Sequence, residues 1–285
     1  MGFVSNDILL KKAQKEGYAV GAFNANNMEI VQAIVETAEE EKAPVILQAS
    51  QGAINYAGID YITVIVKVAS EKASVPVSLH LDHGTDFSQV IKCIRAGFSS
   101  VMFDGSRLPL KDNITITRKV VEIAHPIGVS VEGELGKIGG TEDQVSVQAL
   151  QATMTDPQEA LEFVNKTGVD ALAVAVGTVH GMRTREARLD IKRIEEIRNL
   201  VKIPLVLHGA SGVPDSEIKR AVKAGICKIN IDTEIRKAFV RGVSMFLKEN
   251  PEEIDPRKIL NKAKAEMKEA VREKMRLFGC LGKAM

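Results

Sequence analysis

The segment His80-Leu81-Asp82-His83-Gly84 concentrates residues that do chemistry at one point of the chain. It follows a short apolar run of strand length, residues 75–79, and it precedes a helical pattern. Two imidazoles and a carboxylate offer ligands for a metal ion or groups for proton transfer. Because side chains alternate along a strand, His80 and Asp82 are expected on one face and His83 on the other, unless the backbone bends. Taken alone, the segment fits equally well a buried histidine pair satisfied by hydrogen bonds.

Other polar residues stand at the carboxyl ends of strand-like runs in the same way. They are Asn24, Ser50, Asp104, Glu134, His180, His208, Asn230 and Asp232. Every histidine except His125 falls at such an end. Imidazoles from three strands, with carboxylates from two others, suit a zinc site, because Zn²⁺ prefers nitrogen ligands and a catalytic site keeps one position open.

A phosphate site is indicated after the seventh and eighth strand-like runs, in residues 207–212 and 228–233. Gly209 and Gly212 allow close approach of a ligand to the backbone, although a tight strand-to-helix turn explains them equally well. Lys228 raises a competing chemistry, because a lysine with a depressed pKa forms Schiff bases. Strand alternation puts Lys228 on the same face as Asn230, where pairing with a phosphate or a carboxylate explains it more simply.

Composition excludes several classes of protein. The chain has 285 residues, of which 45% are hydrophobic, and Lys+Arg 38 against Asp+Glu 37 gives a net charge of +1, so neither a nucleic acid nor a membrane surface is an expected partner. Cys93, Cys227 and Cys280 are scattered, which argues against a disulfide framework or a structural zinc site. We find no signal peptide and no apolar run long enough to span a bilayer, and we therefore expect a cytoplasmic protein.

The chain alternates strand-like and helix-like segments. The expected strands cover residues 19–24, 45–50, 75–79, 99–105, 129–134, 171–176, 204–207 and 226–231. Eight such units predict an α/β fold, the (β/α)8 or TIM barrel, with residues 1–285 in a single domain and a C-terminal helical arm at about 256–279. An open doubly wound sheet is the alternative, but it would prefer a glycine fingerprint that residues 21–26 lack. The barrel brings the strand ends together as one active site.

Several motifs along the chain together resemble the class II, metal-dependent ketose-bisphosphate aldolases. They are residues 18–24 (YAVGAFN), 80–84 (HLDHG), 131–136 (VEGELG), 139–143 (GGTED), 177–181 (GTVHG), 208–212 (HGASG) and 255–257 (DPR). The resemblance covers nearly the whole length. It implies reversible cleavage of a ketose 1,6-bisphosphate, first of all fructose 1,6-bisphosphate, to dihydroxyacetone phosphate and glyceraldehyde 3-phosphate in glycolysis and gluconeogenesis, by a homodimer or homotetramer.

The resemblance also implies roles for particular residues. His83, His180 and His208 would hold a catalytic zinc ion, and Asp104 and Glu134 would serve an alternative or second divalent position. Asp82 would be the acid/base at the aldehyde oxygen. Glu142, in the long irregular segment 135–155, would be the second acid/base, delivered to the ketose carbon by movement of that segment. Binding of the dihydroxyacetone phosphate end would fall to Asn24, Ser50, Gly181, Gly209, Ala210, Ser211, Asn230, Ile231, Asp232 and Thr233, with a monovalent cation near the phosphate.

Residues 182–188 depart from the family pattern. Many fructose-specific members carry an aromatic residue, a lysine and a glycine there, and the expected phosphate-binding lysine is missing. Arg183 or Arg185 would replace it if either is more than a solvated loop charge, because a guanidinium binds phosphate bidentately. Two alternatives stay open: a tagatose-1,6-bisphosphate or related inositol-pathway aldolase, and a non-catalytic sugar-phosphate-binding barrel. Retention of Asp82 and Glu142 argues against the second.

Overall fold

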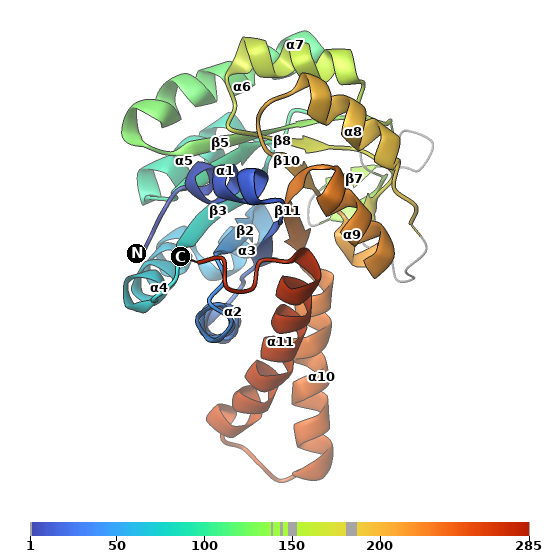
Figure 1. Ribbon diagram of the computed structural model, residues 1–285. Helices are drawn as coiled ribbons and strands as arrows, with labels where there is room; N and C mark the ends of the chain where they lie inside the picture. Colours follow the sequence, from blue (N-terminus) through green and yellow to red (C-terminus); the bar gives the residue numbers. More distant parts are fainter. Residues whose placement is uncertain (1, 138, 143–144, 148–152, 181–186, 285) are drawn as a thin grey trace.

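A closed barrel of parallel strands forms the centre of the computed structural model, which describes residues 2–137, 139–142, 145–147, 153–180 and 187–284 (Figure 1). Its strands are β1 (Val20–Asn24), β2 (Val45–Ser50), β3 (Val77–Gly84), β4 (Ser100–Phe103), β5 (Ser130–Leu135), β8 (Ala171–Val174), β10 (Leu205–Leu207) and β11 (Ile226–Ile231). Each strand pairs with its neighbour in chain order, and β11 closes the barrel onto β1. The predicted (β/α)8 fold is confirmed.

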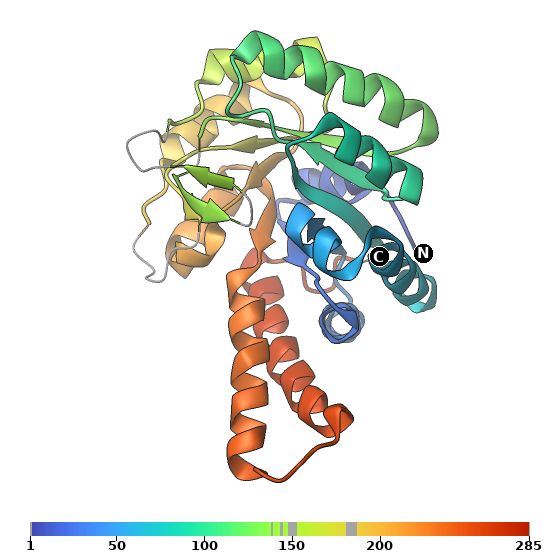
Figure 2. The same ribbon diagram turned by 180° about the vertical axis from the view of Figure 1, so that it is seen from behind.

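Helices surround the barrel, and one or two of them usually follow each strand (Figures 1 and 2). They are α1 (Asn6–Glu16), α2 (Met28–Glu40), α3 (Gln51–Ala57), α4 (Ile59–Lys72), α5 (Phe87–Ala96), α6 (Leu110–Ala124), α7 (Pro157–Thr167), α8 (Ile191–Leu200), α9 (Asp215–Ala224), α10 (Thr233–Glu249) and α11 (Pro256–Phe278), with short 3₁₀ turns η1 (His125–Ile127) and η3 (Ala210–Gly212). Local sequence sets their ends. Asp156 accepts hydrogen bonds from the backbone N–H groups of Gln158 and Glu159 to cap α7, and Gly97 ends α5 in the left-handed region.

The C-terminal arm is a helical pair that extends from the barrel (Figures 1 and 2). α11 follows α10 and lies against α2, where Lys264 Nζ is 2.9 Å from Glu36 and Arg272 Nε is 2.7 Å from Glu41. The predicted helix at 256–279 is therefore confirmed as α11, and α10 forms part of the same arm.

The segment that follows β5 has structure of its own. β6 (Gly139–Glu142) and β7 (Val145–Val147) pair as an antiparallel hairpin, and β6 also pairs in parallel with β9 (Val179–His180). The prediction that residues 135–155 are irregular is wrong for these strands. Two glycines give β6 little strand propensity, and its partner β9 is far away in the sequence.

The helices and the cysteines can be compared with the expectations of no membrane span and no disulfide framework. The described helices include none that is both long enough and apolar enough to cross a bilayer. Cys93, Cys227 and Cys280 are buried and unbridged, and burial raises the pKa of Cys227 to about 11 and the pKa of Cys93 and of Cys280 to about 12.

Candidate active site

A bend at the end of β3 turns two consecutive side chains toward the same site. His83 has φ 49°, in the left-handed region, and the pairing of β3 with β4 shifts register between Leu81 and Gly84. Gly84 permits the bend, because a Cβ atom there would lie 2.5 Å from the carbonyl oxygen of Met102. Strict alternation would have sent His83 to the face opposite Asp82, so the bend is what brings both into the site.

Two imidazoles meet at the carboxyl end of the barrel. His83 Nε2 and His208 Nδ1 are 3.0 Å apart, and the two rings pack edge to face with centroids 4.6 Å apart. The outward nitrogen of each ring contacts a carboxylate. His83 Nδ1 is 2.9 Å from Asp104 Oδ2, and His208 Nε2 is 2.9 Å from Glu132 Oε1. All four side chains are buried.

The two carboxylates fix which nitrogens carry protons. Burial alone would raise the pKa of both, but His83 and Ser106 hold the pKa of Asp104 below its ordinary value, and Lys228 and His208 do the same for Glu132. An ionised carboxylate only accepts hydrogen bonds, so His83 donates from Nδ1 and His208 from Nε2. The remaining nitrogens then present lone pairs to each other.

A divalent metal ion fits this arrangement. When both rings are neutral, these lone pairs face each other at 3.0 Å, and a divalent cation bound by both nitrogens would relieve their repulsion. Nitrogens bound tetrahedrally to zinc at about 2.0–2.1 Å would lie about 3.4 Å apart, close to the separation found. Asp82, His83 and His208 each offer a ligand atom within 4.8 Å of the others, and so do His83, Asp104 and Glu134. The predicted metal residues on β3 and β5 and directly after β4 and β10 are therefore brought together.

Asp82 is held by three amide groups. Its Oδ2 accepts from Asn24 Nδ2 at 2.9 Å and from Gln48 Nε2 at 3.1 Å, and its Oδ1 accepts from Asn230 Nδ2 at 3.0 Å. The carboxylate is fully buried. Such fixed donors orient a carboxylate next to the imidazole pair and leave it little freedom to turn.

Two other predicted residues are placed by their backbone only. His180 lies on β9, opposite Gly140 of β6, and Glu142 lies two residues further along β6. The small three-stranded sheet therefore joins the chain segments that carry the third predicted metal ligand and the second predicted acid/base. Gly181, Arg183 and Arg185 lie outside the described residues.

The predicted phosphate residues follow β10 and β11. Gly209 has φ 63°, and Ala210 and Ser211 lie in η3, while Ile231 ends β11 and Thr233 opens α10. Asp232 stands before the first turn of α10 and contacts Arg236 at 2.7 Å. Ser50 has a structural contact, because its hydroxyl accepts from Ala53 N at 3.2 Å and caps α3. The helix start and the glycine turn offer backbone N–H groups to an anion.

Sequence reasoning missed the partners inside the barrel. Gln48 and Glu132 both stand two positions before a predicted site residue on the same strand, and this spacing was the available signal for them. Lys228 Nζ is 2.9 Å from Glu132 Oε2, so the predicted carboxylate pairing of Lys228 is confirmed. His80 Nδ1 is 2.8 Å from Ser100 Oγ.

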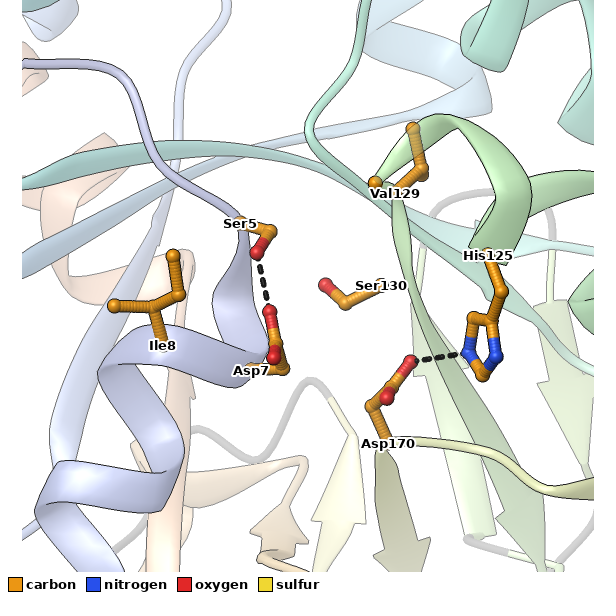
Figure 3. A pocket seen from close by; sticks show the side chains of 8 residues that line it. Ser5, Asp7, Ile8, His125, Val129, Ser130 and Asp170 are labelled. Atoms are coloured by element: carbon orange, nitrogen blue, oxygen red, sulfur yellow. Dashed lines mark hydrogen bonds and ion pairs between the residues drawn. The ribbon is translucent and has the colours of Figure 1, made fainter.

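A polar cavity of about 380 Å³ lies at the opposite end of the strands from the candidate site (Figure 3). There Asp170 Oδ2 accepts from Val131 N at 2.8 Å and lies 2.9 Å from His125 Nε2. Asp7 contacts Ser5 and Lys11. Both carboxylates of this cavity thus already contact protein donors. The described residues of the cavity also include no facing pair of imidazoles like His83 and His208.

A (β/α)8 barrel with imidazoles and carboxylates gathered at the carboxyl ends of its strands belongs to the enzyme class that works on small molecules at that face. Comparison with known proteins identifies the family. A family model described as "Fructose-bisphosphate aldolase class-II" matches residues 4–283, and the chain belongs to this family.

Relatives and solved structures agree with this assignment. A fructose-bisphosphate aldolase of Thermus caldophilus is 46% identical over 299 residues, covering 97% of this chain and 98% of that protein. The YdjI aldolase of Escherichia coli K12 has a similar structure, with a TM-score of 0.88 and 35% identity over 99% of this chain and 100% of that one. The fructose-bisphosphate aldolase of Campylobacter jejuni gives a TM-score of 0.84 and 25% identity over 99% of this chain and 97% of that one.

Proposed function

We propose that this protein cleaves fructose 1,6-bisphosphate reversibly to dihydroxyacetone phosphate and glyceraldehyde 3-phosphate, with a divalent metal ion at the His83–His208 pair. The observation that carries the proposal is the facing of His83 Nε2 and His208 Nδ1 at 3.0 Å beside the buried carboxylate of Asp82. Two nitrogen ligands for a divalent cation thus lie next to a base, and both are needed to cleave a C–C bond beside a carbonyl without a lysine nucleophile.

We propose zinc as the ion, with His180 as the third nitrogen ligand and with Asp104 and Glu134 at an alternative or second divalent position. Mixed nitrogen and oxygen donors support this choice. When bound, the ion acts as a Lewis acid that stabilises the negative charge gained by the ketose half of the substrate.

Asp82 takes the proton from the hydroxyl group whose C–O bond becomes the aldehyde. Its three amide partners keep the carboxylate oriented, so that proton transfer needs no rearrangement of the site. Glu142 acts as the acid/base that transfers the proton at the ketose carbon. Its position on β6, in the same small sheet as β9, supports an approach to the substrate from the side of His180.

The dihydroxyacetone phosphate end binds the turn at Gly209–Ser211 and the start of α10 at Thr233, assisted by Asn230 and by Gly181. Backbone N–H groups at a helix start attract a phosphate dianion, and a monovalent cation is proposed near it. Arg183 or Arg185 would bind the other phosphate. The protein is further proposed to act as a homodimer or homotetramer in the cytoplasm.

The test of the substrate is a cleavage assay that compares fructose and tagatose 1,6-bisphosphates under identical metal loading. We expect kcat/KM to be higher for the fructose compound. A higher value for the tagatose compound would move the protein to the tagatose-specific branch. Metal binding without turnover of either compound would favour a non-catalytic sugar-phosphate-binding barrel.

A further inference from the structure

An ion pair lies buried in the middle of the barrel, beneath the proposed metal site. Lys228 Nζ is 2.9 Å from Glu132 Oε2 and 3.3 Å from Oε1. The exposed fraction is 0% for Lys228 and 1% for Glu132. Such a pair is a weak source of stability, because desolvation of both charges offsets their attraction. Its contacts suggest a role in the site instead.

Glu132 connects the pair to the metal site. Its Oε1 is 2.9 Å from His208 Nε2, while its Oε2 faces His80 Nε2 at 3.5 Å. Lys228 contacts both carboxylate oxygens and so opposes rotation of the group away from His208. The ring of His208 is in turn oriented with Nδ1 toward His83.

We infer that Glu132 and Lys228 are positioning residues that fix the tautomer of His208, and that the lysine serves as charge partner and not as a nucleophile. The inference rests on the proposed function, in which His208 Nδ1 is a ligand of the metal ion. Glu132 accepts the Nε2 proton, which leaves the Nδ1 lone pair for the ion. A carboxylate that holds a metal-binding histidine in this way changes metal affinity by about 10–100-fold when it is lost.

Two double variants separate orientation from charge balance. Glu132→Leu with Lys228→Met replaces the pair by apolar groups and removes the acceptor of His208. Glu132→Gln with Lys228→Met is equally neutral but keeps a carbonyl oxygen for His208 Nε2, and its amide N–H can reach His80 Nε2. Asp170→Asn serves as the control, since it alters a carboxylate that contacts β5 at the far end of the barrel.

Calorimetric titration of zinc into each chelator-treated protein is the measurement, with thermal unfolding as the check of folding. The Leu/Met variant should bind zinc about 10–100-fold more weakly than the wild type, and the Gln/Met variant within about threefold of it. Asp170→Asn should match the wild type. Equal affinity of the two double variants would overturn the inference, as would an equal loss in Asp170→Asn.

Nitrogen NMR on the wild-type protein tests the inference even if the Leu/Met variant fails to fold. With zinc bound, the His208 signals, assigned by their loss in His208→Gln, should show a proton on Nε2. An unprotonated Nε2 would overturn the inference. If the wild type binds zinc but Nε2 of His208 carries no proton, the inference alone fails. If the wild type binds no zinc at all, the proposed function fails as well.

Discussion

His83 Nε2 and His208 Nδ1 face each other at 3.0 Å, and each ring turns its other nitrogen to a buried carboxylate. The two histidines are 125 positions apart in the chain; His83 lies in β3 and His208 directly follows β10. Closure of the barrel is what brings them together. With both rings neutral, the two lone pairs face each other and offer nitrogen ligands to a divalent cation.

Asp82→Asn should leave the zinc content near that of the wild type and lower kcat by about 10²–10⁴, the usual range for a positioned acid/base. The amide N–H of the variant would face one of the donors Asn24, Gln48 or Asn230 and should cost about 1–3 kcal/mol in unfolding free energy. Steady-state kinetics, metal analysis and urea unfolding measure the three effects. Loss of zinc in proportion to activity would instead make Asp82 a metal ligand or a support for one.

Glu142→Ala should slow both cleavage and proton exchange at the carbon of dihydroxyacetone phosphate, while the zinc content stays unchanged. The reason is that the proposed role of Glu142 lies in proton transfer at that carbon and not in metal binding. Exchange of tritium or deuterium from labelled dihydroxyacetone phosphate is the measurement. An unimpaired exchange rate would remove Glu142 from the proposed role.

Gly84→Ala should lower the unfolding free energy by about 1–3 kcal/mol, because its Cβ would lie 2.5 Å from Met102 O and 2.9 Å from Val90 Cγ2. Displacement of the end of β3 should also weaken zinc binding, since His83 precedes Gly84. Urea unfolding in chelator and zinc titration measure the two effects.

The control is Gly17→Ala, at the end of α1, where φ is 74° and no atom lies within 4 Å of the added Cβ. It should cost about 1–2 kcal/mol through backbone strain alone and leave zinc affinity unchanged. Unchanged zinc affinity in Gly84→Ala as well would mean that the bend does not set the geometry of the site.

The sequence predicted the barrel because its strands read as apolar runs and its helices carry clear end signals, such as Asp156 and Gly97. The polar residues at the strand ends could be predicted to form one site, because a barrel brings the carboxyl ends of its strands together. Glu132 could not be assigned a partner, because its contact with Lys228 spans 96 positions and depends on strand register. The side on which His83 lies could not be predicted either, because the alternation of side chains holds only for a regular strand and β3 bends at His83. β6 was not predicted because its two glycines give it little strand propensity and one of its two partner strands, β9, is distant in the sequence.

The most direct test of the account is cleavage of fructose 1,6-bisphosphate by protein treated with a chelator, before and after zinc or cobalt is restored. We predict that chelation abolishes cleavage and that either metal restores it. Full activity in chelator, together with borohydride trapping of the substrate on Lys228, would contradict the account and establish a Schiff-base mechanism.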